Sequence, residues 1–206
     1  MKLFIGCPTL GSVSHLLTER LLVLCQKYPQ YDYEFCFNSK QPTDCNRNQI
    51  VDKFLKSDAE MLLFIDDDML PSEKLFELIK CDKDIIAPLT VIHQAELKTN
   101  LFTFTKREIN YEDDLIKVDA CGCGCVLIKR EVFSKIEKPY FKFISNDDGK
   151  LLMSETFYFY KKLFEKKIDV FVHKNMSCGH LKKIDLRYIN NVFNKGKEAG
   201  KNEIKK

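Results

Sequence analysis

The first half of the chain alternates between two kinds of hydrophobic pattern. Short, nearly continuous apolar runs are typical of strands that are buried on both faces of a sheet. Such runs, together with one segment that alternates aromatic and polar residues, predict strands at residues 2–6, 31–38, 61–65 and 84–91. The intervening segments are longer and more polar, so they need a different structure.

Helices are expected between these strands. Apolar residues recur at the helical period over residues 13–27 and 43–56, and Thr43 is placed to cap the second helix. A short third helix is expected to begin at Pro71. Strands that alternate with helices predict an α/β fold, with a mostly parallel sheet and helices on both of its faces.

The second half of the chain is less regular. Its pattern predicts strands at residues 101–105, 115–120, 125–129 and 169–173, and helices at 130–137 and 154–167. No repeat or low-complexity linker interrupts the chain of 206 residues. We therefore expect one domain over residues 1–181, with halves 1–92 and 93–181, followed by a helical tail at 182–206.

Composition is that of a globular protein with an uneven charge. Hydrophobic residues make up 45% of the chain, which is enough for a core, and the net charge is only +3. Residues 181–206, however, contain eight Lys or Arg residues and three Asp or Glu residues. This basic tail is a candidate for peripheral contact with an anionic membrane, and the alternative is a solvated helix. We expect no nucleic-acid partner.

The amino terminus and the cysteines predict a cytoplasmic protein with reduced thiols. Met1 leads almost directly into a strand, which leaves no room for a signal peptide, and no apolar run approaches the roughly 18 residues of a membrane span. The chain has nine cysteines, an odd number. Those at 121, 123 and 125 alternate and could share one face of a strand as zinc ligands, with Cys178 and His173. Buried free thiols are the preferred interpretation, because this is not the spacing of a zinc knuckle.

Three adjacent aspartates follow the apolar strand at residues 61–65. Asp66, Asp67 and Asp68 would lie at the carboxyl end of that strand, where open α/β sheets bind their ligands. Like charges so close together become favourable when a divalent cation neutralises them, and carboxylate oxygens suit Mg²⁺ or Mn²⁺. A metal held there could bind a diphosphate. The alternative is a polar turn that closes the strand.

Arg47 lies on the apolar stripe of its expected helix. It shares a face with Ile50 and Phe54, so its guanidinium is expected to point toward the sheet rather than into water. A half-buried guanidinium needs a partner. That partner could be a bound nucleotide, or an ion pair with Asp66 or Asp67.

A series of motifs in the right order resembles the GT-A glycosyltransferases, in particular family-2-like members. FIDDDM at residues 64–69 resembles their DXD motif, CGCGCVLIKREVF at 121–133 resembles GxGxxLIxRxVF, and SETFYF at 154–159 resembles the helix start SEDxxF. The first strand ends in Pro8-Thr9, where such enzymes meet the nucleotide, and Cys178-Gly179-His180 resembles a late metal-binding histidine. The helix that contains Arg47 precedes the DXD strand, as in this family.

The resemblance implies a GT-A fold with a small antiparallel sheet on the acceptor side, and an activity to match. A sugar would pass from a nucleotide-sugar donor, with a UDP-sugar expected, to a sugar, lipid-linked or protein acceptor, with inversion. The metal would be held by Asp66, Asp68 and His180, and the imidazole ligand favours Mn²⁺ over Mg²⁺. The residues implied in donor binding are Pro8, Thr9, Arg47, Asp66, Asp67, Gly122 and Gly124.

Glu155 is the candidate catalytic base. An inverting transferase needs a carboxylate to accept the proton of the attacking hydroxyl, and the first turn of a helix favours an ionised carboxylate. The family pattern has an aspartate after this glutamate, and here that position is Thr156. Asp148 is therefore kept as a second candidate, with its neighbour Asp147.

Three other functions remain open at this point. A sugar nucleotidyltransferase has a similar sheet, but the loop CPTLGSVSH at residues 7–15 lacks the glycine-rich, basic character of that class. A phosphatase with an aspartyl nucleophile would place its acidic motif after the first strand. A non-catalytic module that binds nucleotide or metal is supported by Thr156.

Overall fold

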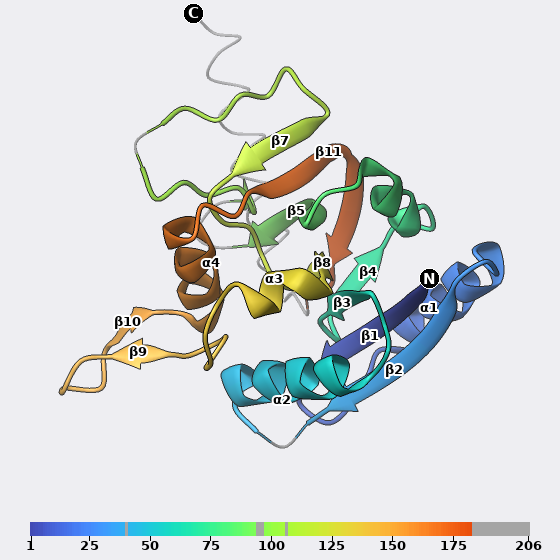
Figure 1. Ribbon diagram of the computed structural model, residues 1–206, viewed down its shortest axis with the longest axis horizontal. Helices are drawn as coiled ribbons and strands as arrows, with labels where there is room; N and C mark the ends of the chain where they lie inside the picture. Colours follow the sequence, from blue (N-terminus) through green and yellow to red (C-terminus); the bar gives the residue numbers. More distant parts are fainter. Residues whose placement is uncertain (40, 94–96, 106, 183–206) are drawn as a thin grey trace, which may run out of the picture.

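The computed structural model of the protein describes residues 1–39, 41–93, 97–105 and 107–182. Within them, a nine-stranded sheet is flanked by helices, and a separate two-stranded hairpin lies beside it (Figure 1). None of the helices in this part of the chain combines the length and the apolar character needed to cross a membrane. The expected tail helix lies outside the described residues, except for its first residue, Lys182.

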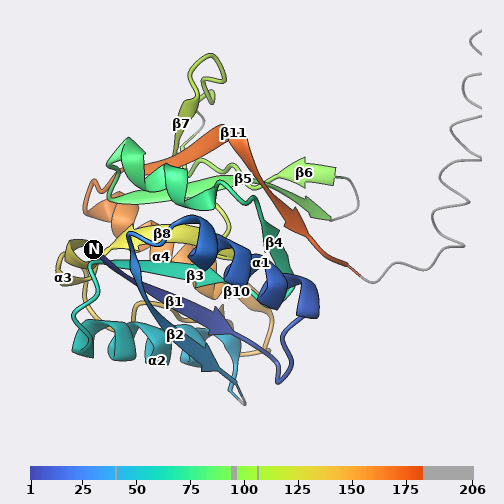
Figure 2. The ribbon, with the colours of Figure 1, turned by 90° about the vertical axis from the view of Figure 1, so that its right-hand side faces the viewer.

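The amino-terminal half forms a parallel β-α-β-α-β unit. β1 (Lys2–Pro8) pairs in parallel with β2 (Asp32–Asn38) on one side and with β3 (Met61–Ile65) on the other. The connecting helices, α1 (His15–Lys27) and α2 (Thr43–Lys56), pack on opposite faces of these strands (Figure 2). These five predicted elements are confirmed. Thr43 is the first helical residue of α2, however, and Pro42 occupies the N-cap position that was predicted for Thr43.

The remaining strands extend this unit into a mixed sheet of order β2-β1-β3-β8-β5-β11-β4. β8 (Cys125–Lys129) is antiparallel to both of its neighbours, β3 and β5 (Ile85–His93). β11 (Val170–His180) runs parallel to β5. At its carboxyl end β11 also pairs, antiparallel, with β4 (Met69–Pro71). Because β8 is antiparallel to both of its neighbours, β3 and β5 run in the same direction, together with β1, β2 and β11. The predicted mostly parallel α/β sheet is therefore confirmed.

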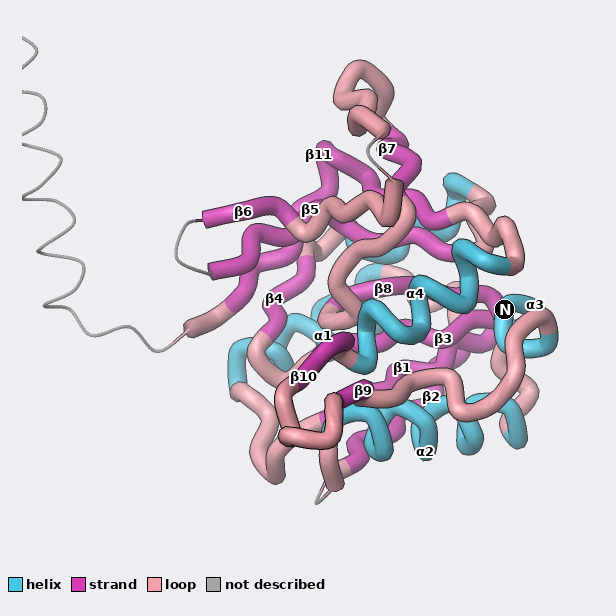
Figure 3. The backbone as a smooth tube through the Cα atoms, turned by 90° about the vertical axis from the view of Figure 1, so that its left-hand side faces the viewer, coloured by secondary structure: helices cyan, strands magenta, loops and turns pink. Residues whose placement is uncertain are grey.

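Short elements complete the second half. β6 (Leu97–Thr99) pairs with β5, and β7 (Leu115–Val118) pairs with β11. The hairpin of β9 (Ile144–Ser145) and β10 (Leu151–Met153) is the small antiparallel sheet that the resemblance implied. Figure 3 shows α4 (Glu155–Glu165) lying across the sheet, with this hairpin between α4 and α2.

Two hydrophobic cores fill the space between the sheet and its helices. One packs α2, α3 (Arg130–Ser134) and α4 against one face. The other packs α1 and η1 (Leu75–Cys81), a 3-10 helix, against the opposite face. The contact between α2 and β1 is so close that a Cβ atom on Gly6 would lie 2.3 Å from Cγ2 of Ile50. Only glycine fits at that position.

Several predicted elements differ from the structure. The helix expected from Pro71 is replaced by β4 and η1; a proline is tolerated in β4 because this strand pairs on one side only, with β11. The strand expected at residues 101–105 is reduced to a single bridge between Phe102 and Ala120. The strand expected to end at His173 continues to His180 through a bulge, and this extension brings its last residues to β4.

Candidate active site

Two adjoining hollows open at the carboxyl ends of β1 and β3. The larger has a volume of about 360 Å³, and its walls include Arg47 of α2, Glu155 of α4 and His180 of β11. The smaller, of about 180 Å³, lies between the Pro8–Thr9 end of β1 and the three aspartates. Thr43 and Asp66 line both hollows. The amino termini of α2 and α4 both face this region, so their partial positive charges favour an anion there.

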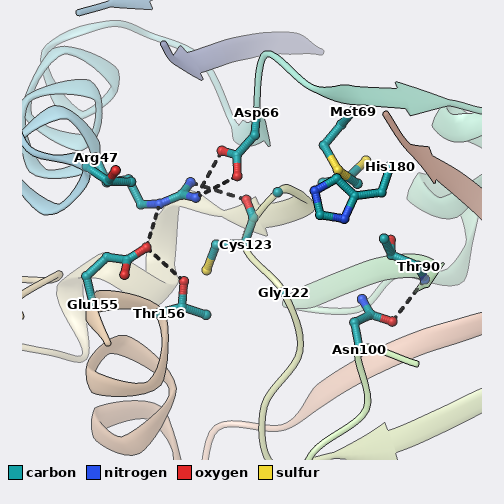
Figure 4. Close-up of a pocket in the computed structure, with 13 residues that line it drawn as sticks. Arg47, Asp66, Met69, Thr90, Asn100, Gly122, Cys123, Glu155, Thr156 and His180 are labelled. Carbon is teal, nitrogen blue, oxygen red and sulfur yellow. Dashed lines mark hydrogen bonds and ion pairs between the residues drawn. The ribbon is translucent and has the colours of Figure 1, made fainter. Parts of the chain in front are cut away.

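Arg47 lies at the centre of the larger hollow, with its side chain between two carboxylates (Figure 4). Its Nη2 group donates to both oxygens of Asp66 at 2.9 and 3.0 Å, and its Nη1 group donates to the carbonyl oxygen of Cys123 at 3.2 Å. The guanidinium also lies over the ring of Phe64, 5.2 Å from its centroid. Arg47 is only 2% exposed. Of the partners that the sequence left open for Arg47, the structure shows the ion pair with Asp66.

Burial and charge act in opposite directions on this pair. Desolvation alone would lower the pKa of Arg47, but the neighbouring carboxylates outweigh it and raise the pKa above its usual value, so the guanidinium stays charged. Desolvation raises the pKa of Asp66, and Arg47 opposes that shift. The guanidinium therefore stays charged and neutralises the carboxylate of Asp66 in the wall of the hollow.

Glu155 is the first residue of α4 and is buried against the same guanidinium. Its Oε1 atom lies 3.6 Å from Nε of Arg47 and accepts a hydrogen bond from the hydroxyl of Thr156 at 3.0 Å. The helix begins there because the side chain of Ser154 caps the N–H of Phe157. Thr156, which replaces the aspartate of the family pattern, is thus a hydrogen-bond donor to the candidate base.

Asp67 orders the loop after β1. Its Oδ2 atom accepts a hydrogen bond from the hydroxyl of Thr9 at 2.7 Å and from the N–H of Leu10 at 3.3 Å. Because the same loop forms a wall of the smaller hollow, Asp67 shapes that hollow through the backbone.

Asp68 lines the smaller hollow and contacts His180, which lines the larger one. Its Oδ2 atom is 3.1 Å from Nε2 of His180, and it also accepts a hydrogen bond from the ammonium group of Lys182. The backbone N–H of Leu181 donates to the carbonyl oxygen of Asp68 at 2.7 Å. The end of β11 is therefore attached to the aspartate turn through both backbone and side chains.

The predicted metal ligands fit a divalent cation only in part. Neighbouring ligands of an octahedral ion with bonds of about 2.1 Å lie about 3 Å apart, and the spacing of Asp68 Oδ2 and His180 Nε2 agrees with this. Asp66 instead gives both carboxylate oxygens to Arg47. Across the described ranges, no three His, Cys, Asp or Glu side chains are grouped to hold a metal ion. Within the described residues, two side chains are thus placed to hold a metal at this position, and water or a bound diphosphate would supply the other ligands.

The glycines of the 121–133 segment line the larger hollow. A Cβ atom on Gly124 would lie 3.1 Å from Oδ2 of Asp66 and 3.3 Å from the sulfur of Met69. On Gly122 the nearest atoms would be 3.9 Å away, on Asn100. Gly124 is therefore needed for the close approach of β8 to the aspartate turn, whereas Gly122 leaves free space for a ligand.

The structure thus brings most of the predicted site residues together. Asp148 and its neighbour Asp147 are absent from both hollows: they lie exposed on the turn between β9 and β10, where Asn146 donates to Asp148 at 3.4 Å.

Sequence analysis missed Asn100 and Lys182. Asn100 is buried and accepts a hydrogen bond from the N–H of Thr90 at the far wall of the larger hollow, and no motif marks it. Lys182 had a usable signal, because residues two apart in an extended chain point to the same side, and it follows His180 by two.

The cysteines are free thiols, as preferred from the sequence. Residues 121–124 form a turn before β8 rather than a strand, so the alternation at 121, 123 and 125 does not define one face of a sheet. Cys121 lies 2.9 Å from the hydroxyl of Tyr160, and burial raises the pKa of Cys123 to about 11. Within the described part of the chain, no cluster with three zinc ligands is present.

Comparison with known proteins supports the fold. No protein-family model and no curated protein matches the sequence. Among solved structures, A197 from STIV aligns with a TM-score of 0.65 and 20% identity over 89% of this chain and 87% of that chain. The inositol-1-phosphate CTP transferase from T. maritima aligns with a TM-score of 0.46 and 10% identity over 86% and 88%. The alignment with A197 shows that the chain has a GT-A-like α/β fold.

Proposed function

We propose that the protein is a metal-dependent glycosyltransferase that moves a sugar from a nucleotide-sugar donor to an acceptor hydroxyl, with inversion. The observation that supports this most strongly is the pair of adjoining hollows that share Asp66 and Thr43, with Asp68 in the wall of the smaller hollow and His180 in the wall of the larger. A nucleotide in the smaller hollow and a sugar in the larger one would place the donor diphosphate at their junction. We expect a UDP-sugar as the donor.

The residues at the junction suit a diphosphate. Asp68 and His180 would hold Mn²⁺ or Mg²⁺ there, and the cation would supply positive charge to the departing nucleotide diphosphate. The amino terminus of α2 adds partial positive charge at Thr43, on the wall that both hollows share. Thr9 and Asp67 would fix the loop against which the nucleotide lies.

Glu155 is the proposed base. In a single displacement, its carboxylate takes the proton of the acceptor hydroxyl while the hydroxyl oxygen bonds to the anomeric carbon. The bond between that carbon and the phosphate oxygen breaks, and the nucleotide diphosphate leaves with the electron pair. Arg47 and Thr156 hold Oε1 of Glu155 in place, 3.6 and 3.0 Å away. Asp148 would have to move in from its exposed turn to serve instead.

A binding module without turnover is the second candidate. One observation favours it: Thr156 stands where the family pattern has an aspartate. Its hydroxyl donates a hydrogen bond to Glu155 rather than to a substrate. Such a module would bind the same donor at the same residues, but it would release no nucleotide.

Donor binding is tested first, by thermal unfolding with UDP-, GDP-, CMP- and dTDP-sugars, each with and without Mn²⁺. A ligand present at one hundred times its Kd stabilises the folded state by about 2.7 kcal/mol, which for a chain of this size raises the Tm by about 5–10 °C. We expect such a rise with a UDP-sugar that depends on Mn²⁺. If no donor raises the Tm, the proposed function is refuted.

Turnover is then measured as release of the nucleotide diphosphate from the donor that binds. Glu155→Gln should keep the rise in Tm but lower the release rate at least about 100-fold. Glu165→Gln, an exposed change at the other end of α4, is the matched control and should leave the rate unchanged. Binding without release in the wild type would favour the module.

A further inference from the structure

The carboxylate of Asp68 already has a cation from the chain itself. Both the ammonium group of Lys182 and Nε2 of His180 contact the same oxygen, Oδ2. The other two aspartates have partners of their own: Asp66 binds Arg47, and Asp67 binds Thr9. The three adjacent acids are therefore all paired within the protein, and Asp68 is paired with the most exposed of these partners.

The two cations of the site differ in how firmly they are held. The side chain of Arg47 is 3% exposed, has several protein partners and lies over an aromatic ring. The side chain of Lys182 is 42% exposed, and its contact with Asp68 is the one ion pair recorded for it within the described residues. Exposed ion pairs of this kind contribute only about 0.2–1 kcal/mol. Lys182 can therefore leave Asp68 at little cost, whereas Arg47 cannot leave Asp66.

The backbone keeps Lys182 within reach after it leaves. The N–H of Leu181 donates to the carbonyl oxygen of Asp68, and His180 is paired with Met69 of β4. Lys182 directly follows Leu181, whose backbone is hydrogen-bonded to Asp68, so the side chain of Lys182 starts close to the carboxylate. A divalent ion bound to Oδ2 and an ammonium group on the same oxygen would repel each other at contact distance.

We propose that Lys182 is an internal competitor for the cation position at Asp68, so that the ammonium group and a divalent metal ion occupy Oδ2 in turn. This rests on the metal position of the proposed function and deepens it. Metal binding displaces Lys182 from the carboxylate, and Lys182 lowers the affinity of the site for free metal. The competition holds Asp68 neutralised when no metal is present.

The test is direct measurement of Mn²⁺ binding to the full chain without any donor. Free Mn²⁺ is counted by its electron paramagnetic resonance signal as protein is titrated, for the wild type, Lys182→Met and Lys182→Arg. Removing the competing charge in Lys182→Met should tighten Mn²⁺ binding by about two- to fivefold, as expected for loss of an exposed ion pair. Lys182→Arg keeps the charge and should bind Mn²⁺ about as weakly as the wild type.

Two controls make the result specific to Asp68. Lys161→Met removes one positive charge from an exposed pair with Glu165 on α4 and should leave Mn²⁺ affinity unchanged. Asp68→Asn should abolish the binding in both the wild-type and the Lys182→Met background. Thermal unfolding of each variant without metal shows whether it is folded.

The outcomes separate this inference from the proposed function. Equal or weaker Mn²⁺ binding by Lys182→Met overturns the competition, because the lysine would then be neutral or helpful to the metal. Absence of Mn²⁺ binding in every variant also overturns it. In either case, thermal shifts with nucleotide sugars report independently whether the donor site exists.

Discussion

Nη2 of Arg47 donates to both carboxylate oxygens of Asp66, at 2.9 and 3.0 Å, across a distance of 19 residues in sequence. This contact joins α2 to the turn after β3 and so fixes one wall of both hollows. It also explains why Asp66 and Asp68 have different partners. Asp66 belongs to the buried ionic network with Arg47 and Glu155, whereas Asp68 contacts His180 and Lys182.

Replacing Arg47 should therefore destabilise the protein strongly. Arg47→Met keeps most of the side-chain volume but leaves two carboxylates without their cation, and breaking a buried pair in this way costs about 3–5 kcal/mol. Urea unfolding of the variant measures the loss. Lys161→Ala, in an exposed pair with Glu165, should change stability by less than about 1 kcal/mol. If the two changes lowered stability equally, the buried network would contribute no more to stability than an exposed ion pair does.

The two glycines of the cavity wall offer a matched comparison. Gly124→Ala would place a methyl group 3.1 Å from the Asp66 carboxylate, so we expect a loss of stability of about 1–3 kcal/mol from overpacking. Gly122→Ala meets nothing closer than 3.9 Å and should unfold at nearly the wild-type urea concentration. Its added methyl group should instead weaken binding of the nucleotide sugar. The reverse order of stabilities would contradict the packing described for β8.

Asn100 should matter for both stability and the far wall of the larger hollow. Its side-chain oxygen accepts from the N–H of Thr90 at 2.9 Å, and its own N–H donates to the carbonyl of Thr90. Asn100→Ala leaves a buried donor without a partner, which costs about 1–3 kcal/mol. Asn100→Asp keeps an acceptor for the N–H of Thr90, so the stability of this variant should lie between that of the wild type and that of Asn100→Ala. Its added negative charge should weaken donor binding, and unchanged donor affinity would place Asn100 away from the ligand.

Thiol reactivity should follow burial. Burial raises the pKa of Cys7 to about 12 and that of Cys123 to about 11, so at pH 8 neither forms an appreciable amount of the reactive thiolate in the folded protein. Cys45 is exposed and should be alkylated first by iodoacetamide, at a rate that rises with pH as its thiolate forms. Peptide mass spectrometry before and after unfolding in urea measures this. If Cys123 in the folded protein were alkylated as fast as Cys45, this would contradict the burial of the turn that contains Cys123.

Local patterns predicted the first half of the fold well, because β1 and β3 are nearly continuous apolar runs that are buried on both faces, and α2 has one recognisable apolar stripe. The helical stripe through Ile50 also placed Arg47 toward the sheet. Strand order was not accessible in the same way. That β8 lies between β3 and β5 depends on contacts more than 30 residues apart, and no local pattern marks which strands become neighbours.

The same division applies to the site. Asp66, Glu155 and His180 were found because each belongs to a motif in an expected order. The sequence left open whether Asp66 binds a metal or pairs with Arg47, because that depends on where α2 places the guanidinium in three dimensions. Asn100 was missed because nothing about a single asparagine in a sequence indicates what it will contact, whereas Lys182 could have been inferred from its spacing of two residues from His180.

The position of β8 also has a consequence for synthesis of the protein. A chain emerging from a ribosome delivers β1, β2, β3 and β5 before β8, yet β3 and β5 do not pair with each other and both wait for Cys125–Lys129. Until then two strands rich in apolar residues have open edges, the arrangement most prone to pairing with other chains. The nascent protein should therefore be most dependent on chaperones before residue 129 leaves the exit tunnel, and the other edge of β5 stays open until β11 is made.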